Sequence, residues 1–140
     1  DYSRVIELNP DNPTPYYNRA LNYNKLGEPD AALADLTKVI ELVPEYGDTY
    51  IARGRVHIRQ QNYDAALKDF TAAIKLLPES AIGYRQRAET YIQMNNLDAA
   101  LTDYDQAIKL DPNDAVAYSN RGYIHAQKKN EEAAFKDYNK

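Results

Sequence analysis

The chain has 140 residues, a formal net charge of −4 and a sequence pI of about 5.2. An acidic balance of this kind argues against general nucleic-acid binding, because phosphate backbones attract clustered Lys and Arg. The chain contains no cysteine, which excludes disulfides and thiol catalysis. No apolar run is long enough for direct insertion into a membrane as a spanning helix.

The predicted elements are all helices, and they follow one another in pairs. Asp1–Leu8 is expected to be the end of a helix. The first helix of each pair (the A helix) is expected at about 13–26, 47–60, 81–94 and 115–128. Its partner (the B helix) is expected at about 30–42, 63–76, 97–110 and 131–140.

Short polar side chains mark most of the expected helix starts, because they accept a hydrogen bond from a free N–H of the first turn. The expected caps of three B helices are Asn62, Asn96 and Asn130. The expected caps of three A helices are Asn12, Ser80 and Asp114. Two starts are less well specified. Glu28 is followed by Pro29, which suits a first helical position, and Tyr46 is a poor cap.

One spacing runs through the whole chain, because the same residue types return every 34 positions. Proline recurs at Pro10, Pro44, Pro78 and Pro112. The same register repeats tyrosine (Tyr16, Tyr50, Tyr84, Tyr118) and alanine (Ala32, Ala66, Ala100, Ala134). It also repeats arginine (Arg19, Arg53, Arg87, Arg121) and aspartate (Asp35, Asp69, Asp103, Asp137). A fixed period of this length is typical of stacked structural repeats.

The places within the period carry a resemblance to a known family. Counted from Pro13, Gly47, Ala81 and Ala115, each unit has an aromatic at place 4 and a small residue at place 8. Alanine falls at place 20 of all four units, and proline falls at place 32 of the first three. This pattern resembles the tetratricopeptide repeat, a helix–turn–helix unit. It departs from the commonest form in having Tyr at place 4 and Arg at place 7.

The resemblance implies an all-α fold, namely an α-solenoid (a right-handed superhelix) of stacked antiparallel helix pairs. We expect a single array over residues 1–140, with four units and a partial helix at the N-terminus. Residues 1–10 would end a preceding repeat, and the units would be 13–46, 47–80, 81–114 and an incomplete 115–140. Both ends fall inside a repeat, so the sequence is expected to be a piece of a longer array.

The repeating arginines and the two histidines are the residues that invite a chemical interpretation. Each Arg at place 7 has a co-repeating Asp at place 23, which predicts Arg–carboxylate contacts within or between repeats. The alternative is an arginine ladder for phosphates or an acidic partner. His57 and His125 both occupy place 11 and are interpreted as packed side chains, because no matched metal ligands accompany them. No nucleophile–base set or glycine-rich phosphate loop is present, so we expect no enzymatic activity and no cofactor.

Places 2, 5, 6, 9, 12 and 13 of each A helix point away from the apolar stripe formed by places 4, 8 and 11. The resemblance implies that these places line a concave groove that contacts peptides. Four basic and two acidic residues occupy them. The predicted groove residues are Tyr17, Asn18, Leu21, Lys25, Ile51, Arg55, Ile58, Arg59, Arg85, Gln86, Glu89 and Asn120. Alanine in place of Arg55, Arg59 or Arg85 is expected to leave stability nearly unchanged.

Two binding modes of the family can be compared residue by residue. The places that clamp a terminal carboxylate in one subgroup hold Tyr17, Leu21, Ala52, Ile82 and Gln86 here, so that clamp is essentially absent. An asparagine ladder at place 6, as in the O-linked N-acetylglucosamine transferase superhelix, is matched by Asn18 and Asn120. Ala52 interrupts the ladder, and Gln86 is an imperfect substitute.

The sequence therefore predicts a non-enzymatic scaffold for protein–protein interaction. It would hold a partner peptide or helix with acidic and apolar side chains in the groove of the A helices. Two alternatives stay open. One is a structural module that self-associates end to end through exposed apolar stripes, and the other is a targeting or regulatory module of a larger enzyme.

Overall fold

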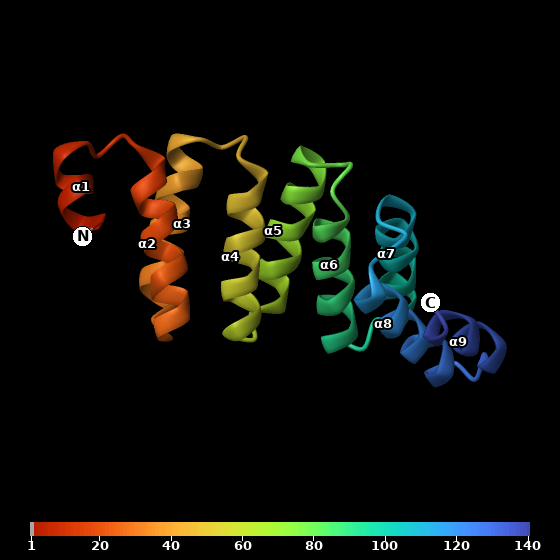
Figure 1. The fold of residues 1–140 in the computed structure, drawn as a ribbon. Coiled ribbons are helices and arrows are strands. Elements are labelled where there is room, and N and C mark those ends of the chain that lie inside the picture. The colour runs from red at the N-terminus through yellow and green to blue at the C-terminus, as the bar shows by residue number, and fades with distance from the viewer. Residues whose placement is uncertain (1) are drawn as a thin grey trace. The chain divides into compact units, whose positions relative to one another are not determined.

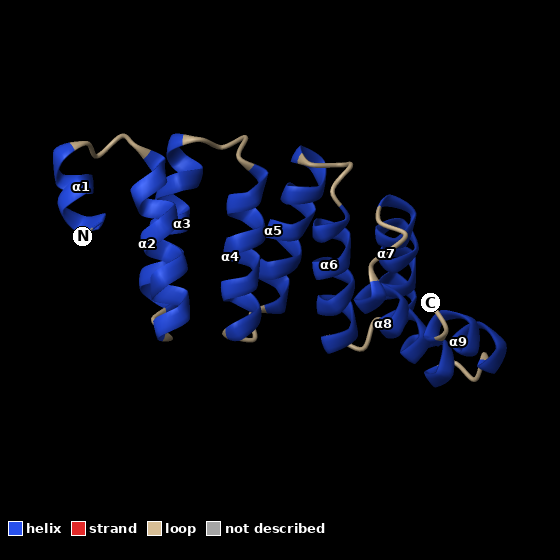
Figure 2. Cartoon of the chain, viewed as in Figure 1, coloured by secondary structure: helices blue, strands red, loops and turns tan. Residues whose placement is uncertain are grey.

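The computed structural model describes residues 2–140, and within them it contains nine α-helices and no strand (Figures 1 and 2). The first five helices are α1 (Tyr2–Leu8), α2 (Pro13–Leu26), α3 (Pro29–Leu42), α4 (Gly47–Arg59) and α5 (Tyr63–Leu76). The other four are α6 (Ala81–Gln93), α7 (Leu97–Leu110), α8 (Ala115–Gln127) and α9 (Glu131–Tyr138).

The observed bounds of the helices lie within two residues of the expected ones. The expected helix Asp1–Leu8 is observed from Tyr2, since Asp1 lies outside the described residues. The contacts divide the chain into two compact units, one ending at Leu77 and the other spanning Pro78–Lys140.

Each unit is a stack of antiparallel helix pairs. In the first unit α2 packs on α3 and α4 packs on α5, while α3 also packs on α4 (Figure 1). In the second unit α6 packs on α7, α8 packs on α9, and α7 joins the two pairs. Each pair therefore covers the apolar side of its neighbour, which is the arrangement of an α-solenoid.

The capping signals explain where most helices begin. The three asparagines expected at B-helix starts each accept a hydrogen bond from the third N–H of their helix. Asn12 and Asp114 cap α2 and α8 in a similar way. The expected cap at Ser80 is wrong, because Ser80 occupies the N-cap position of α6 without a side-chain hydrogen bond. Glu28 and Tyr46 also make no capping bond, as expected.

Close approach of the two helices in a pair depends on a small residue facing a large one. A Cβ added at Gly54 would lie 2.6 Å from the ring of Phe70, and one added at Gly122 would lie 2.9 Å from the ring of Tyr138. Real Cβ atoms do not approach other atoms so closely. Place 8 therefore determines how near the B helix can come, and place 24 fills the space that the small residue leaves.

The predicted Arg–carboxylate contacts are present in all four repeats. Each place-7 guanidinium donates two hydrogen bonds, from Nε and Nη2, to the two oxygens of the place-23 aspartate of its own repeat. The eight distances lie between 2.6 and 2.9 Å. The four aspartate residues are at most 5% exposed. A tyrosine ring also lies within 5.9 Å of the guanidinium carbon in three repeats.

Arg19, Arg53 and Arg121 also contact the preceding B-type helix. The third donor, Nη1, reaches the hydroxyl of Ser3 from Arg19 and the hydroxyl of Thr37 from Arg53. In the second unit Arg121 reaches the carboxylate of Asp105 at 2.7 Å. Each of these guanidinium groups thus connects three successive helices, which couples a repeat to the one before it.

The packing of α3 predicts that the effect of a larger side chain on stability depends strongly on its position in the helix. Ala32 is fully buried, whereas Ala34, two residues away, is exposed. We expect Ala32→Leu to lower the free energy of unfolding by about 1–3 kcal/mol through overpacking, and Ala34→Leu to change it by less than about 0.5 kcal/mol. Urea unfolding followed by circular dichroism measures both. Ala66→Leu and Ala100→Leu should resemble Ala32→Leu, and equal effects of all four substitutions would contradict this packing.

Candidate peptide-binding faces

The predicted groove residues fall on the A helices of both units. The first unit contains Tyr17, Asn18, Leu21 and Lys25 on α2, and Ile51, Arg55, Ile58 and Arg59 on α4. The second unit contains Arg85, Gln86 and Glu89 on α6, and Asn120 on α8. Lys25, Arg55 and Arg59 are exposed, Ile51 is buried and the others are half-buried. The two sets therefore form two faces, one in each unit.

Ile51 does not lie on the open surface as expected. Its side chain is 6% exposed, and the neighbouring Ala52 is 8% exposed. The sequence pattern placed Ile51 on the outward side of α4, but α4 packs against both α3 and α5, so its apolar stripe is wider than places 4, 8 and 11 alone. Ile51 therefore belongs to the core, while Ile58 keeps a half-exposed position.

Two cations lie together at the end of α2. Arg59 extends from α4 and donates from Nη1 to the main-chain carbonyl of Asn24 at 2.6 Å and to its side-chain oxygen at 3.0 Å. Lys25 is the next residue after Asn24 and is exposed. Among residues 2–140, neither Lys25 nor Arg59 has a carboxylate partner. The nearby Asp30 instead accepts from Gln60 at 2.9 Å. Both cations of this corner are therefore open to a carboxylate of a ligand.

An apolar cavity opens beside Tyr17, at the opposite end of α2. Its volume is about 240 Å³. The residues that line it are Pro13, Thr14, Tyr17, Val39, Val43 and Tyr46. The rings of Tyr17 and Tyr46 lie 5.9 Å apart, and burial raises the pKa of the Tyr17 hydroxyl above its ordinary value. Sequence reasoning missed the cavity, although Thr14 and Tyr17 occupy outward places, because its other walls come from the end of α3 and from the following loop.

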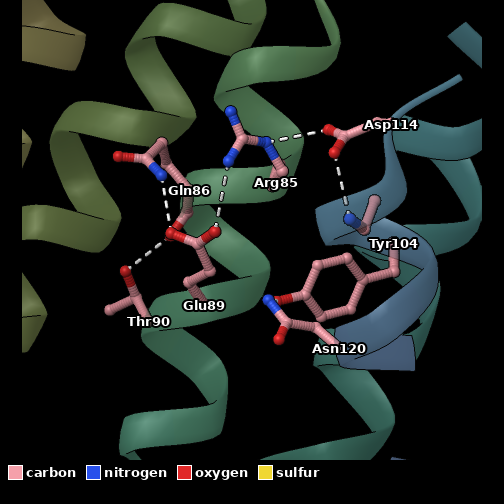
Figure 3. A network of polar contacts seen from close by, with 8 residues as sticks. Arg85, Gln86, Glu89, Thr90, Tyr104, Asp114 and Asn120 are labelled. Carbon is pink, nitrogen blue, oxygen red and sulfur yellow. Dashed lines mark hydrogen bonds and ion pairs between the residues drawn. The ribbon is translucent and has the colours of Figure 1, made fainter. Parts of the chain in front are cut away.

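The face of the second unit is occupied by a polar network (Figure 3). The Nε of Arg85 lies 2.9 Å from a carboxylate oxygen of Asp114, and its Nη1 lies 3.5 Å from Glu89. Gln86 donates to the other oxygen of Glu89 at 2.6 Å. Asp114 also accepts from the main-chain N–H of Ala117 at the start of α8. The network therefore connects α6 to the N-terminus of α8.

Arg85 was predicted to be an open cation of the groove whose replacement by alanine leaves stability unchanged, and the network shows that both expectations are wrong. The side chain is 24% exposed, and it lies between two carboxylates, so it contributes no free positive charge to the face. Removing it would leave Asp114, which is 12% exposed, without its ion-pair partner. Arg85→Ala is therefore expected to lower stability, unlike a change at an exposed cation. The pairing could not be read from the repeat, because it joins places 5 and 34, which do not repeat these residues.

The asparagine ladder suggested by the sequence is only partly available. Asn120 donates from its side-chain amide to the hydroxyl of Tyr104 at 3.0 Å (Figure 3). Tyr104 is fully buried, and burial raises the pKa of its hydroxyl well above its ordinary value. Gln86 is held by Glu89. The bond of Asn120 thus connects α8 to α7, and that of Gln86 lies within α6; both leave less hydrogen-bonding capacity for a peptide backbone.

His57 lies beside the Arg53–Asp69 pair of its own repeat. Its Nε2 is 3.9 Å from a carboxylate oxygen of Asp69, and its buried Nδ1 has no hydrogen-bond partner among residues 2–140. Burial lowers the pKa of His57 below its ordinary value, and Asp69 only partly offsets this effect. No group of three or more potential metal ligands is found in the described part of the chain. Within the same residues, no helix combines the length and apolarity needed to cross a membrane.

Comparison with protein-family models shows which family this arrangement belongs to. A model described as tetratricopeptide repeat matches residues 17–81 and 51–91, and a model described as TPR repeat matches residues 88–129. The chain belongs to the tetratricopeptide repeat family. No match was found among curated protein sequences. The family accounts for the period of 34 residues and for the paired helices of both units.

Solved structures of tetratricopeptide repeat proteins share the fold. A crystal structure of MamA aligns with a TM-score of 0.92 and 24% identity, covering 99% of this chain and 81% of MamA. MamA from Desulfovibrio magneticus RS-1 aligns with a TM-score of 0.89 and 20% identity, covering 99% and 78%. The first TPR domain of Spaghetti (RPAP3), bound to the HSP90 peptide SRMEEVD, aligns with a TM-score of 0.79 and 22% identity, covering 83% and 92%.

The environment of His57 predicts a pH dependence of stability. The folded state holds His57 at a lowered pKa, whereas the unfolded chain protonates it near its ordinary value of about 6.5. The unfolded state therefore binds more protons as the pH falls below about 6.5, and the free energy of unfolding decreases. We expect His57→Gln to reduce this loss of stability on acidification, as measured by urea unfolding at a series of pH values.

The matched control for this measurement is His125→Gln, the same substitution at the same place of the fourth repeat. This control should retain the contribution of His57 to the pH dependence. An unchanged pH dependence in His57→Gln would show that the buried imidazole does not contribute to it.

Proposed function

We propose that the chain is a non-catalytic protein-interaction module that binds a partner segment on the A-helix face of its first unit. Membership of the tetratricopeptide repeat family supports a protein-interaction role, and a neighbour of similar fold is bound to a peptide. The partner segment would be acidic and apolar. The face consists of the outward residues of α2 and α4.

The single observation that carries this proposal is that neither Lys25 nor Arg59 has an ion-pair partner among residues 2–140. Both are exposed; Lys25 lies near the end of α2, and Arg59 reaches the adjacent Asn24 from α4. Arg85, the cation predicted for the second unit, is already paired with Asp114 and Glu89. Lys25 and Arg59 thus provide two cations without an ion-pair partner among residues 2–140 on the A-helix face of the first unit, where they can attract carboxylates.

The remaining surface of α2 supplies apolar contact next to these charges. Tyr17, Leu21 and Lys25 are spaced by four residues, so they lie along one side of the helix. Tyr17 and Leu21 are half-buried against the core of the first unit, which leaves part of each side chain open to a ligand. A partner with apolar side chains near one end and carboxylates near the other complements this order.

The proposal predicts a specific effect of charge reversal. Heptapeptides selected from a random displayed library against the immobilised chain should be enriched in Asp and Glu. A synthetic peptide from that selection should bind much more weakly, by about tenfold or more, to the double variant Lys25→Glu and Arg59→Glu. Each reversal replaces an attraction by a repulsion of similar size. Isothermal titration calorimetry at low and high salt measures the change, and salt should weaken wild-type binding.

The matched control reverses two exposed lysines on the B helix of the same unit, Lys68 and Lys75. That variant carries the same net charge and should keep nearly the wild-type affinity. Selected peptides without acidic residues, or equal losses in both double variants, would contradict the proposed face.

A further inference from the structure

We infer that the cavity beside Tyr17 is an anchor site for one aliphatic or aromatic side chain of the partner segment. The anchor would lie on the same segment as the carboxylates that contact Lys25 and Arg59. This inference rests on the proposed function and adds a second, apolar requirement at a defined distance from the charge. The sequence pattern did not indicate it.

The size and the walls of the cavity indicate what it can hold. Its volume of about 240 Å³ is below the range of roughly 300–1,000 Å³ that is typical of sites for drug-sized ligands. Its walls are aliphatic and aromatic, with the hydroxyls of Thr14, Tyr17 and Tyr46 as the main side-chain polar groups. A single apolar side chain therefore suits the cavity better than a cofactor or a charged group.

The packing of the walls indicates that the cavity exists before a ligand arrives. Val39 is fully buried and holds the floor on α3. Tyr17 packs against the core cluster of the first unit. Tyr46 is 45% exposed and contacts the ring of Tyr17, so it forms a wall that is open to solvent on one side. A preformed site of this kind costs little reorganisation on binding.

The register of α2 determines the distance between the anchor and the charge. Tyr17 and Lys25 are eight residues apart on one side of the helix, which corresponds to a rise of about 12 Å. Leu21 lies midway between them. An extended peptide spans about 3.3 Å per residue, so its carboxylate would follow the anchor, or precede it, by about four residues. The occupant is therefore a segment with one large apolar residue and an acidic residue about four positions away.

Short synthetic peptides test this inference directly. Each peptide is acetylated and amidated and contains one Leu, a Gly/Ser spacer and a Glu–Glu pair, with one, three or seven spacer residues. A reversed series has the Glu–Glu pair first. A matched set has Ala in place of Leu, and another has Gln in place of Glu. Calorimetry gives the affinities, and ¹³C methyl spectra of Val39 and Val43 report occupation of the cavity.

We expect the three-residue spacer to give the tightest binding in at least one of the two directions. Replacement of Leu by Ala should weaken that peptide by about tenfold or more, since it removes most of a buried side chain. The methyl signals of Val39 and Val43 should shift with the Leu peptide and not with the Ala peptide.

Substitutions at the rim of the cavity test whether the Leu side chain enters it, because they can block the entrance without affecting the folding of the chain. Thr14 is exposed, so Thr14→Trp should block the cavity entrance without disturbing the core, and Thr14→Ser is its control. Thr14→Trp should abolish the difference in affinity between the Leu peptide and the Ala peptide. Tyr46→Ala should also reduce that difference, whereas Tyr123→Ala, at an exposed tyrosine of the second unit, should leave it intact.

The outcomes distinguish this inference from the proposed function. Equal affinities of Leu and Ala peptides, unshifted Val39 and Val43 methyls, or no binding by any peptide would overturn the anchor site. Binding that depends on Glu and on Lys25 and Arg59, but not on Leu, would leave the proposed function in place. Binding that depends on Leu but is the same for Glu and Gln peptides would support the cavity and contradict the acidic partner.

Discussion

The fold of each unit depends on a bidentate ion pair between the two helices of a repeat. The guanidinium at place 7 contacts both oxygens of a nearly buried aspartate, and one such pair is Arg53–Asp69. Removing one partner of a buried pair typically costs about 3–5 kcal/mol, although the intact pair adds little net stability. The pair therefore acts mainly on register: a B helix that slides or turns would leave both charges desolvated and unpaired.

This constraint also separates the framework from the variable surface. The third guanidinium donor reaches the preceding helix, as in Arg53 to Thr37, so spacing between neighbouring repeats of a unit is held by the same residue. The outward places of the A helices do not take part in these repeated pairs. They can differ from repeat to repeat, and in the first unit they include Lys25 and Arg59, neither of which has an ion-pair partner among residues 2–140.

The sequence predicted the features that repeat and missed those that do not. Helix ranges, asparagine caps and the Arg–Asp pairs all follow from residues that recur every 34 positions. The same residue types in three or four repeats therefore support each of these predictions. The Arg85–Asp114 contact and the burial of Ile51 depend on single residues in one repeat. The cavity at Tyr17 requires a loop side chain, Tyr46, whose position no periodic pattern specifies. Three-dimensional packing, and not propensity, decides such features.

The two faces consequently differ in what they can recognise, although the same scaffold carries both. In the second unit Asp114 caps α8 and also occupies Arg85, so an incoming carboxylate would have to displace a group that is already held at a helix N-terminus. In the first unit Arg59 contacts only the neutral oxygens of Asn24, so an incoming carboxylate displaces no anion. An acidic ligand should therefore prefer the first unit, even though each unit contributes an arginine to the predicted groove.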